Sequence, residues 1–169
     1  MSHAMALFRE ALSTGWVPQD DLYAFTPTVS PAVHHEWATG AVLYLTTVTS
    51  GVGAAGLMML KYLLTGAIAV GCYCCARRRG AGVMAFATLA FLVFPFGWVG
   101  FGTVRAQLFT LLFLVCLLLL LEEDRRGRRW WLAAWLPIYI VWLNMHAGFV
   151  AGVGLFGLYT IESFGRALA

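Results

Sequence analysis

Two arginine clusters separated by long apolar runs are the feature that most constrains how this chain folds. One cluster occupies residues 77–79 and the other lies within residues 125–129. Short arginine-rich loops mark the cytoplasmic side of a membrane protein, because basic loops are retained during insertion. The two clusters therefore predict which ends of the neighbouring apolar runs face the cell interior.

The composition agrees with a polytopic membrane protein. The mean hydropathy is +0.79, and 61% of the residues are hydrophobic while 11% are charged. Soluble domains carry a charge on about a quarter of their residues. The net charge of +3 does not indicate nucleic-acid binding, because the arginines lie in short loops rather than along one basic face. We therefore expect the lipid bilayer as a partner and no nucleic acid.

Residues 1–50 are predicted to form an extracytoplasmic unit. Apolar residues recur at helical spacing over residues 5–16, which predicts an amphipathic helix on the membrane surface. Prolines make residues 17–33 an extended acidic loop. Residues 36–49 would be about 21 Å long as a helix, shorter than the roughly 30 Å hydrocarbon core. We interpret this stretch as a juxtamembrane helix, with a sixth, short span as the alternative.

Residues 51–169 are predicted to form a transmembrane bundle, which makes the fold all-α with about five spans plus one or two interfacial helices. The expected spans are residues 53–76, 82–100, 106–122, 130–145 and 147–165. With the arginine clusters inside, the N-terminus lies outside and the C-terminus in the cytoplasm. Eight of the eleven basic residues then face the cytoplasm. We expect a multi-pass protein of the inner (cytoplasmic) membrane.

The polar residues that could take part in binding or catalysis lie at the opposite, extracytoplasmic ends of the apolar runs. They are Asp20, Asp21, His34, His35, Glu36, Arg105, Gln107, Asn144 and His146. An unpaired polar group near hydrocarbon is costly, so these side chains are expected to cluster or to line a wet cavity. There a carboxylate or an imidazole can act as a general base, and an arginine can hold a phosphate. This combination predicts transfer of a group from a lipid phosphate.

Other interpretations of these residues stay open. Each side chain alone could cap a turn, extend toward the interface or satisfy a backbone carbonyl. Carboxylates and imidazole also suit Mn or Zn, so a divalent metal could be held by Asp20, Asp21, His35 and Glu36. A tetrapyrrole on His146 or His35 is a further alternative. No tight ligand spacing supports a metal, and we expect no cofactor.

Two glycines near the last predicted span are spaced for close helix approach. Gly148 and Gly152 are four residues apart, with Gly154 and Gly157 further along. We expect ordinary packing within the chain, with a dimer motif as the alternative.

Four short runs carry a resemblance to a known family. They are Pro18-Gln-Asp-Asp21-Leu-Tyr23-Ala-Phe-Thr26, His35-Glu36-Trp37, Arg105-Ala-Gln107-Leu-Phe and Asn144-Met-His146-Ala-Gly-Phe149. The chain resembles bacterial polytopic proteins of the GT-C glycosyltransferase superfamily, related to the protein mannosyltransferase and aminoarabinose transferase group. The order also resembles the family: an outer acidic loop, a juxtamembrane helix, a span with an early basic residue (here Lys61) and an arginine-rich inner loop.

The resemblance implies a polyprenyl-phosphate sugar as donor and an outer-loop aspartate as base. It makes Asp21 the first candidate base and Asp20 the second. The implied substrate-binding residues are His35, Glu36, Arg105, Gln107, Asn144 and His146. The resemblance covers roughly residues 8–160, the N-terminal half of the family's fold, which implies a truncated module that is incomplete as a catalyst alone.

The competing interpretation is a non-catalytic subunit. The chain would then be an accessory or scaffold component of a larger integral membrane complex, respiratory or photosynthetic. Under either interpretation we expect other membrane subunits as partners.

Overall fold

The computed structural model of the chain describes residues 3–20, 26, 30–34, 36–102 and 104–168. Within these ranges the regular structure is helical and contains no strand, which confirms the all-α prediction. The elements are α1 (His3–Thr14), α2 (Trp37–Tyr44), the π-helix η1 (Leu45–Thr49), α3 (Ala54–Arg78), α4 (Val83–Gly102), α5 (Ala106–Arg125), α6 (Trp131–Met145) and α7 (Phe149–Leu168).

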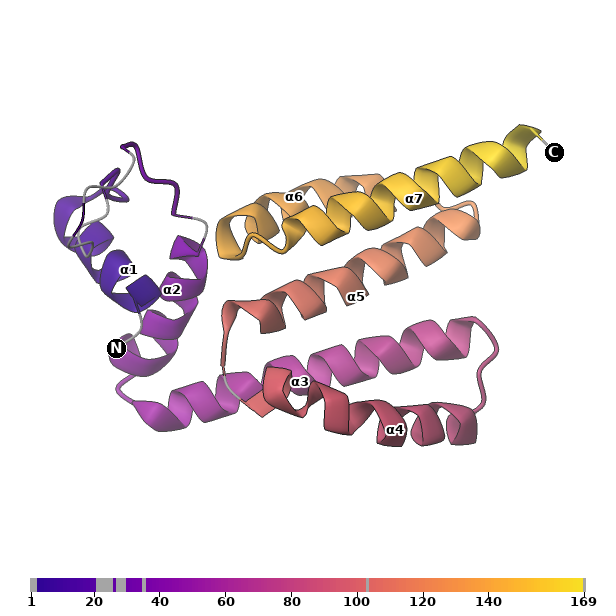
Figure 1. Cartoon of the computed structure of the whole chain (residues 1–169), viewed down its shortest axis with the longest axis horizontal. Coiled ribbons are helices and arrows are strands. Elements are labelled where there is room, and N and C mark those ends of the chain that lie inside the picture. The colour runs from indigo at the N-terminus through magenta and orange to yellow at the C-terminus, as the bar shows by residue number, and fades with distance from the viewer. Residues whose placement is uncertain (1–2, 21–25, 27–29, 35, 103, 169) are drawn as a thin grey trace.

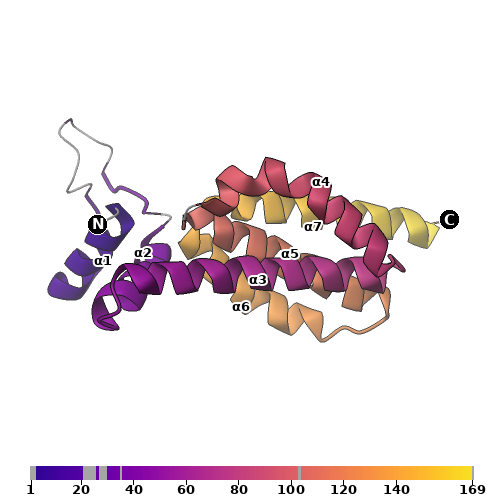
Figure 2. The same ribbon diagram turned by 90° about the horizontal axis from the view of Figure 1, so that it is seen from below.

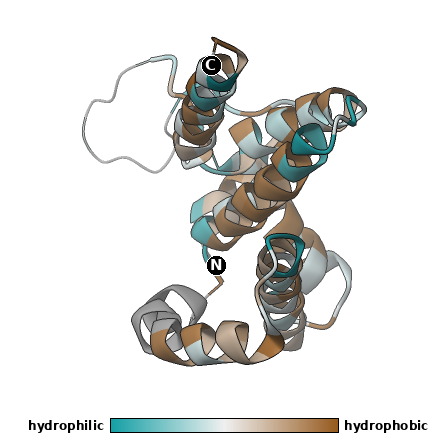
Figure 3. Cartoon of the chain, turned by 90° about the vertical axis from the view of Figure 1, so that its right-hand side faces the viewer, coloured by the Kyte–Doolittle hydropathy of each residue, from teal (hydrophilic) through white to brown (hydrophobic). Residues whose placement is uncertain are grey.

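The helices are arranged along the long axis of the molecule (Figure 1). Helices α1 and α2 lie together at one end, and α3 to α7 extend from there toward the other end, as the view from below also shows (Figure 2). The turns that follow α3 and α5, which carry the arginine clusters, lie at the far end together with the C-terminus. Seen from that end, hydrophilic residues gather at the turns while hydrophobic residues cover the helices (Figure 3).

Helices α3 and α5 are long and apolar enough to cross a membrane, with 25 and 20 residues. At 1.5 Å per residue they are about 38 Å and about 30 Å long, against a hydrocarbon core of about 30 Å. Only 22% of the most apolar part of α3 is buried inside the molecule, and 44% of that of α5. Helix α3 therefore leaves large apolar side chains exposed, among them Met58, Met59, Tyr62 and Leu63.

Helix α5 contributes more buried residues to the hydrophobic core than any other described helix. Its second half packs against α6 and α7 in a cluster of Leu117, Leu120, Leu121, Trp131, Trp135, Trp142 and Tyr159. Its first half packs mainly against α3, in a cluster of Leu64, Ile68, Leu108, Phe109, Val115 and Met145. A helix that is apolar on every face can be buried on more than one side, which makes α5 the central helix.

Glycine allows α6 and α7 to approach closely. A Cβ atom at position 152 would overlap the Trp142 indole ring, and one at position 148 would overlap the side chains of Thr110 and His146. Both glycines therefore serve packing within the chain, as the sequence predicted. By contrast, a Cβ at Gly154 or Gly157 would meet no described atom within 4 Å.

Helix α1 packs on α2, and it buries Ala4, Met5 and Leu7. Gly40 of α2 lies so close that a Cβ there would overlap the backbone carbonyl of Ala4. The sequence predicted both helices. The contact between them is a finding of the structure, because an apolar stripe does not reveal whether lipid or another helix covers it.

The arginine turns are joined by acidic side chains of α5. Arg78 and Arg128 each lie 2.8 Å from a carboxylate oxygen of Glu123, which is 5% exposed. Next to it, Asp124 accepts hydrogen bonds from the Trp131 indole N–H at 2.8 Å and from the Tyr159 hydroxyl at 2.7 Å. A buried carboxylate requires such partners, so this network holds α3, α5, α6 and α7 together at the arginine end.

Candidate functional site

A cavity of about 310 Å³ lies where α1, α2 and the start of α5 meet. Three predicted site residues, Glu36, Arg105 and Gln107, line this α1–α2–α5 cavity together with His3 and Thr39. The helices that meet around this cavity lie at the end of the molecule opposite the arginine turns (Figure 1). The structure therefore gathers part of the predicted polar set in one place.

Local backbone geometry brings these three side chains to the cavity. Glu36 immediately precedes α2, where its carbonyl accepts the Gly40 N–H at 2.9 Å while its carboxylate caps no backbone group of that helix. Arg105 immediately precedes α5 in extended backbone, with φ −128° and ψ 160°. Gln107 follows in the first turn of α5. Glu36, Arg105 and Gln107 are all exposed, so their polar ends remain accessible to a ligand.

His146 lies beside Glu36, with its Nε2 atom 3.6 Å from Oε1 of the carboxylate. Its Nδ1 atom accepts the Gly148 backbone N–H at 3.0 Å and lies 2.9 Å from the Thr110 hydroxyl. The Thr110 hydroxyl in turn accepts the Trp142 indole N–H at 3.1 Å. Because Nδ1 acts as an acceptor, we assign the proton of the neutral ring to Nε2, the nitrogen that faces Glu36. We call these side chains of Trp142, Thr110 and His146 the His146 network.

Asn144 adjoins the site through the contact between α2 and α6. Its Oδ1 atom accepts the Trp37 indole N–H at 2.9 Å, and its Nδ2 atom donates to the Ile140 carbonyl at 2.8 Å. The buried Thr39 hydroxyl donates to the Met145 carbonyl at 2.6 Å. These bonds hold the start of α2 against the end of α6, so Asn144 contributes to positioning Glu36.

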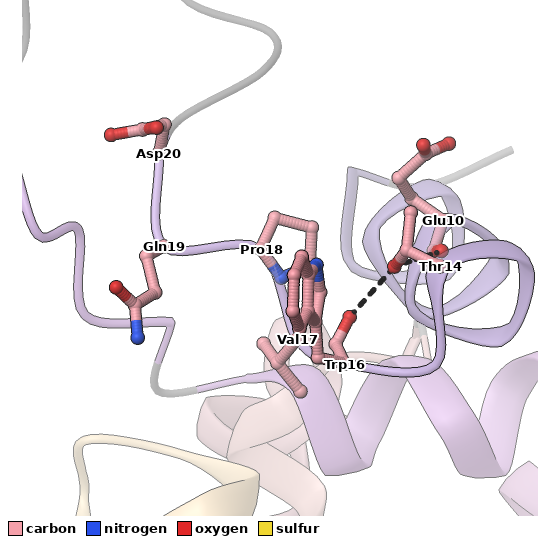
Figure 4. A pocket seen from close by; sticks show the side chains of 7 residues that line it. All are labelled: Glu10, Thr14, Trp16, Val17, Pro18, Gln19 and Asp20. Atoms are coloured by element: carbon pink, nitrogen blue, oxygen red, sulfur yellow. Dashed lines mark hydrogen bonds between the residues drawn. The ribbon is translucent and has the colours of Figure 1, made fainter.

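Asp20 lies apart from this group. It lines a separate cavity of about 460 Å³ with Glu10 and Trp16, and its carboxylate points away from both of them (Figure 4). Its Oδ1 atom accepts the Ser30 hydroxyl at 2.6 Å, so Asp20 connects two parts of the proline-rich loop. Asp21 and His35, the other candidate base and another predicted binding residue, lie outside the described residues.

In the described part of the chain, no three His, Cys, Asp or Glu side chains come close enough together to hold a metal ion. Of the predicted metal set, Asp20 and Glu36 line different cavities, and Asp21 and His35 are not described.

The structure also adds residues that sequence reasoning did not select. Thr39 follows Glu36 by three residues and Thr110 follows Gln107 by three, a spacing that places side chains on one face of a helix. That spacing was the available signal. His34, one of the polar residues already noted in the sequence, has its Nε2 atom buried without a described hydrogen-bond partner. His34 lines a third cavity, of about 270 Å³, on which Glu36 also borders.

Comparisons with known proteins found no relative. No protein-family model matches this chain, and no curated protein or solved structure matches it.

Proposed function

We propose that this chain is a membrane-embedded module of the GT-C type, related to lipid-linked sugar transfer at the extracytoplasmic face. The observation that carries the proposal is the α1–α2–α5 cavity, where Glu36, Arg105 and Gln107 meet. Its position opposite the arginine turns matches a site on the outer side of the membrane (Figure 1).

In this proposal α3 to α7 are five spans, with the N-terminus outside and the C-terminus in the cytoplasm of a bacterial cell. The common position of both arginine turns supports this topology, as do the lengths of α3 and α5. Exposed apolar side chains on α3, α4 and α7 would face lipid. Helix α6 has 15 residues and is about 22 Å long, so it would require local thinning of the bilayer.

The cavity offers the groups that a sugar phosphate requires. The Arg105 guanidinium can donate paired hydrogen bonds to a phosphate, and the Gln107 amide can bind a further oxygen. At the edge of the cavity, Glu36 of the lining lies beside His146, which is outside the lining, so that a carboxylate and an imidazole stand side by side for proton transfer. The family resemblance assigns the base to Asp21, with Asp20 second, and His35 to the binding residues. The donor we propose is a polyprenyl-phosphate sugar.

Donor binding provides the first test. The purified chain in detergent would be titrated with polyprenyl phosphate, and bound lipid counted by native mass spectrometry. Arg105→Gln should weaken binding at least tenfold, because a hydrogen bond to a charged group contributes about 1.5–3 kcal/mol. Arg9→Gln is the matched control, since Arg9 is an exposed residue of α1 outside the cavity lining. Equal effects of the two variants would contradict the proposed donor site.

Transfer provides the second test. In a strain complemented with the chain, Asp21→Asn and Glu36→Gln should each abolish sugar transfer while the protein level stays unchanged. If both variants keep full transfer, the chain is not catalytic.

The second candidate function is that of an accessory or scaffold subunit in a larger membrane complex. The outer faces of α4 and α7 favour it, with exposed Met84, Leu89, Phe91, Ile161 and Phe164. On α7, Gly154 and Gly157 leave open space that a partner helix could fill. Replacing either glycine by leucine should then dissociate a complex that co-purifies in mild detergent. Gly148 and Gly152 would not test assembly, because they pack within the chain.

A further inference from the structure

A groove between α5 and α7 at the arginine end has no part in the proposed transfer. It encloses about 250 Å³. Its apolar lining comes from Leu118 and Leu121 of α5 and Leu155 and Leu158 of α7. Its charged lining lies nearer the turns and consists of Arg79, Arg125 and Glu162. This α5–α7 groove thus changes from apolar to charged along the helices, with two arginines and one carboxylate at the charged end.

The two arginines of the groove differ in accessibility. Arg125 is fixed, because its Nη2 atom lies 2.7 Å from Glu162 and its guanidinium stands over the Tyr159 ring, 5.4 Å from the centroid. Arg79 is 59% exposed, and its Nε atom lies 3.5 Å from Glu122. The described contacts of Arg79 therefore leave its Nη atoms accessible to a further acceptor.

The charge balance at this end favours an anionic ligand. The helix ends and turns there carry eight arginines, at positions 77, 78, 79, 125, 126, 128, 129 and 166, and four acidic residues, at positions 122, 123, 124 and 162. The four acids leave an excess of four positive charges. Such a cluster beside a membrane attracts anionic headgroups.

We propose that the α5–α7 groove binds one anionic phospholipid of the cytoplasmic leaflet. One acyl chain lies along the four leucines, and Arg79 donates hydrogen bonds to the phosphodiester. The proposal rests on the membrane placement proposed above for α3 to α7 and is independent of sugar transfer.

Native mass spectrometry of the full chain in detergent, titrated with phosphatidylglycerol, tests the proposal. We expect one tightly bound lipid, and Arg79→Gln should weaken its binding about tenfold through loss of a charge-assisted hydrogen bond. Arg77→Gln is the matched control: it removes the same charge two residues away, outside the groove lining, where Arg77 donates to the Ala81 carbonyl. Equal losses in the two variants, or no loss with Arg79→Gln, would overturn the proposal.

A second pair of variants tests the acyl-chain path. Leu158→Trp should fill the groove and displace the lipid, while Ile161→Trp should not, because Ile161 is an exposed residue of α7 outside the groove lining. Phosphatidylethanolamine and diacylglycerol should bind several-fold more weakly than phosphatidylglycerol; equal binding would refute recognition of an anionic headgroup. These results do not depend on Arg105, so failure here and failure of the donor site are separable.

Discussion

Thr110 is the residue on which the orientation of His146 depends. Its hydroxyl accepts from the fully buried Trp142 and lies within hydrogen-bond distance of the His146 ring. Thr110→Val should lower the free energy of unfolding by roughly 1–3 kcal/mol, because it leaves a buried indole N–H unpaired. Thr110→Ser should stay near the original value. Unfolding in mixed detergent micelles, followed by circular dichroism, measures both.

Thr160→Val serves as the control for this prediction. The Thr160 side chain is exposed and its hydroxyl donates to the Phe156 carbonyl of its own helix. A loss at position 160 as large as at position 110 would show that the His146 network adds no stability.

Gly152 is expected to be intolerant of any side chain. Gly152→Ala should destabilise the chain by roughly 1–3 kcal/mol, the cost of overpacking, because the added methyl group overlaps the Trp142 ring. Gly154→Ala, which meets open space two residues away, should be neutral or slightly stabilising. The same unfolding measurement applies, and identical effects at the two positions would contradict the packing of α6 on α7.

At the level of single residues, the sequence predicted part of the candidate site. Glu36, Arg105 and His146 each stand next to a helix end on the same side of the apolar runs, so topology alone brings them together. The sequence could not show that Asp20 lies apart from these three residues, because the position of the Asp20 carboxylate depends on the path of a loop and on its hydrogen bond to Ser30. Nor could it identify Thr110, whose role arises from contact with another helix.

At the scale of single elements, the apolar runs predicted the helices closely. Arginine clusters and glycines end most of the runs, as Gly51 and Gly53 do with φ angles of 72° and 60°. Helix α1 illustrates which feature the sequence did not predict. Its apolar spacing predicted an amphipathic helix, but its packing on α2 depends on the absence of a side chain at Gly40.

Gly40→Val should release α1 from α2. Trypsin cleavage after Arg9, which lies within α1, should then become about tenfold faster, because protease access follows local opening. Gly66→Val is the control, since a Cβ at that position meets no described atom within 4 Å. Unchanged cleavage after Arg9 in the Gly40 variant would show that α1 is held by other contacts.

The proposed orientation of the whole molecule can be tested with cysteines. In a background without the four native cysteines, Ala147→Cys should react with a membrane-impermeant maleimide added to intact spheroplasts. Ala81→Cys should react only after permeabilisation. The two alanines lie in turns at opposite ends of the helices, so they form a matched pair. The reverse labelling pattern would contradict the orientation.

The position of the arginine clusters predicted the two polar ends of the molecule. The order of helix packing was not predictable in the same way, because runs of leucine and valine offer little to distinguish one neighbour from another. The central place of α5 depends on specific contacts, such as a Val115 methyl group against the backbone at Gly71.

The buried Glu123 carboxylate has a consequence for biosynthesis. It binds Arg78, made 45 residues earlier, and Arg128, made five residues later. The turn after α3 therefore emerges from the ribosome well before Glu123, the residue that binds it. The set of contacts is complete only when the next basic turn, with Arg128, has also emerged. Protease digestion of ribosome-arrested chains should find this turn protected in intermediates in which residue 128 has emerged from the ribosome and cleavable in those arrested before residue 123 has emerged. Protection at the shorter length would show that the turn settles without the carboxylate.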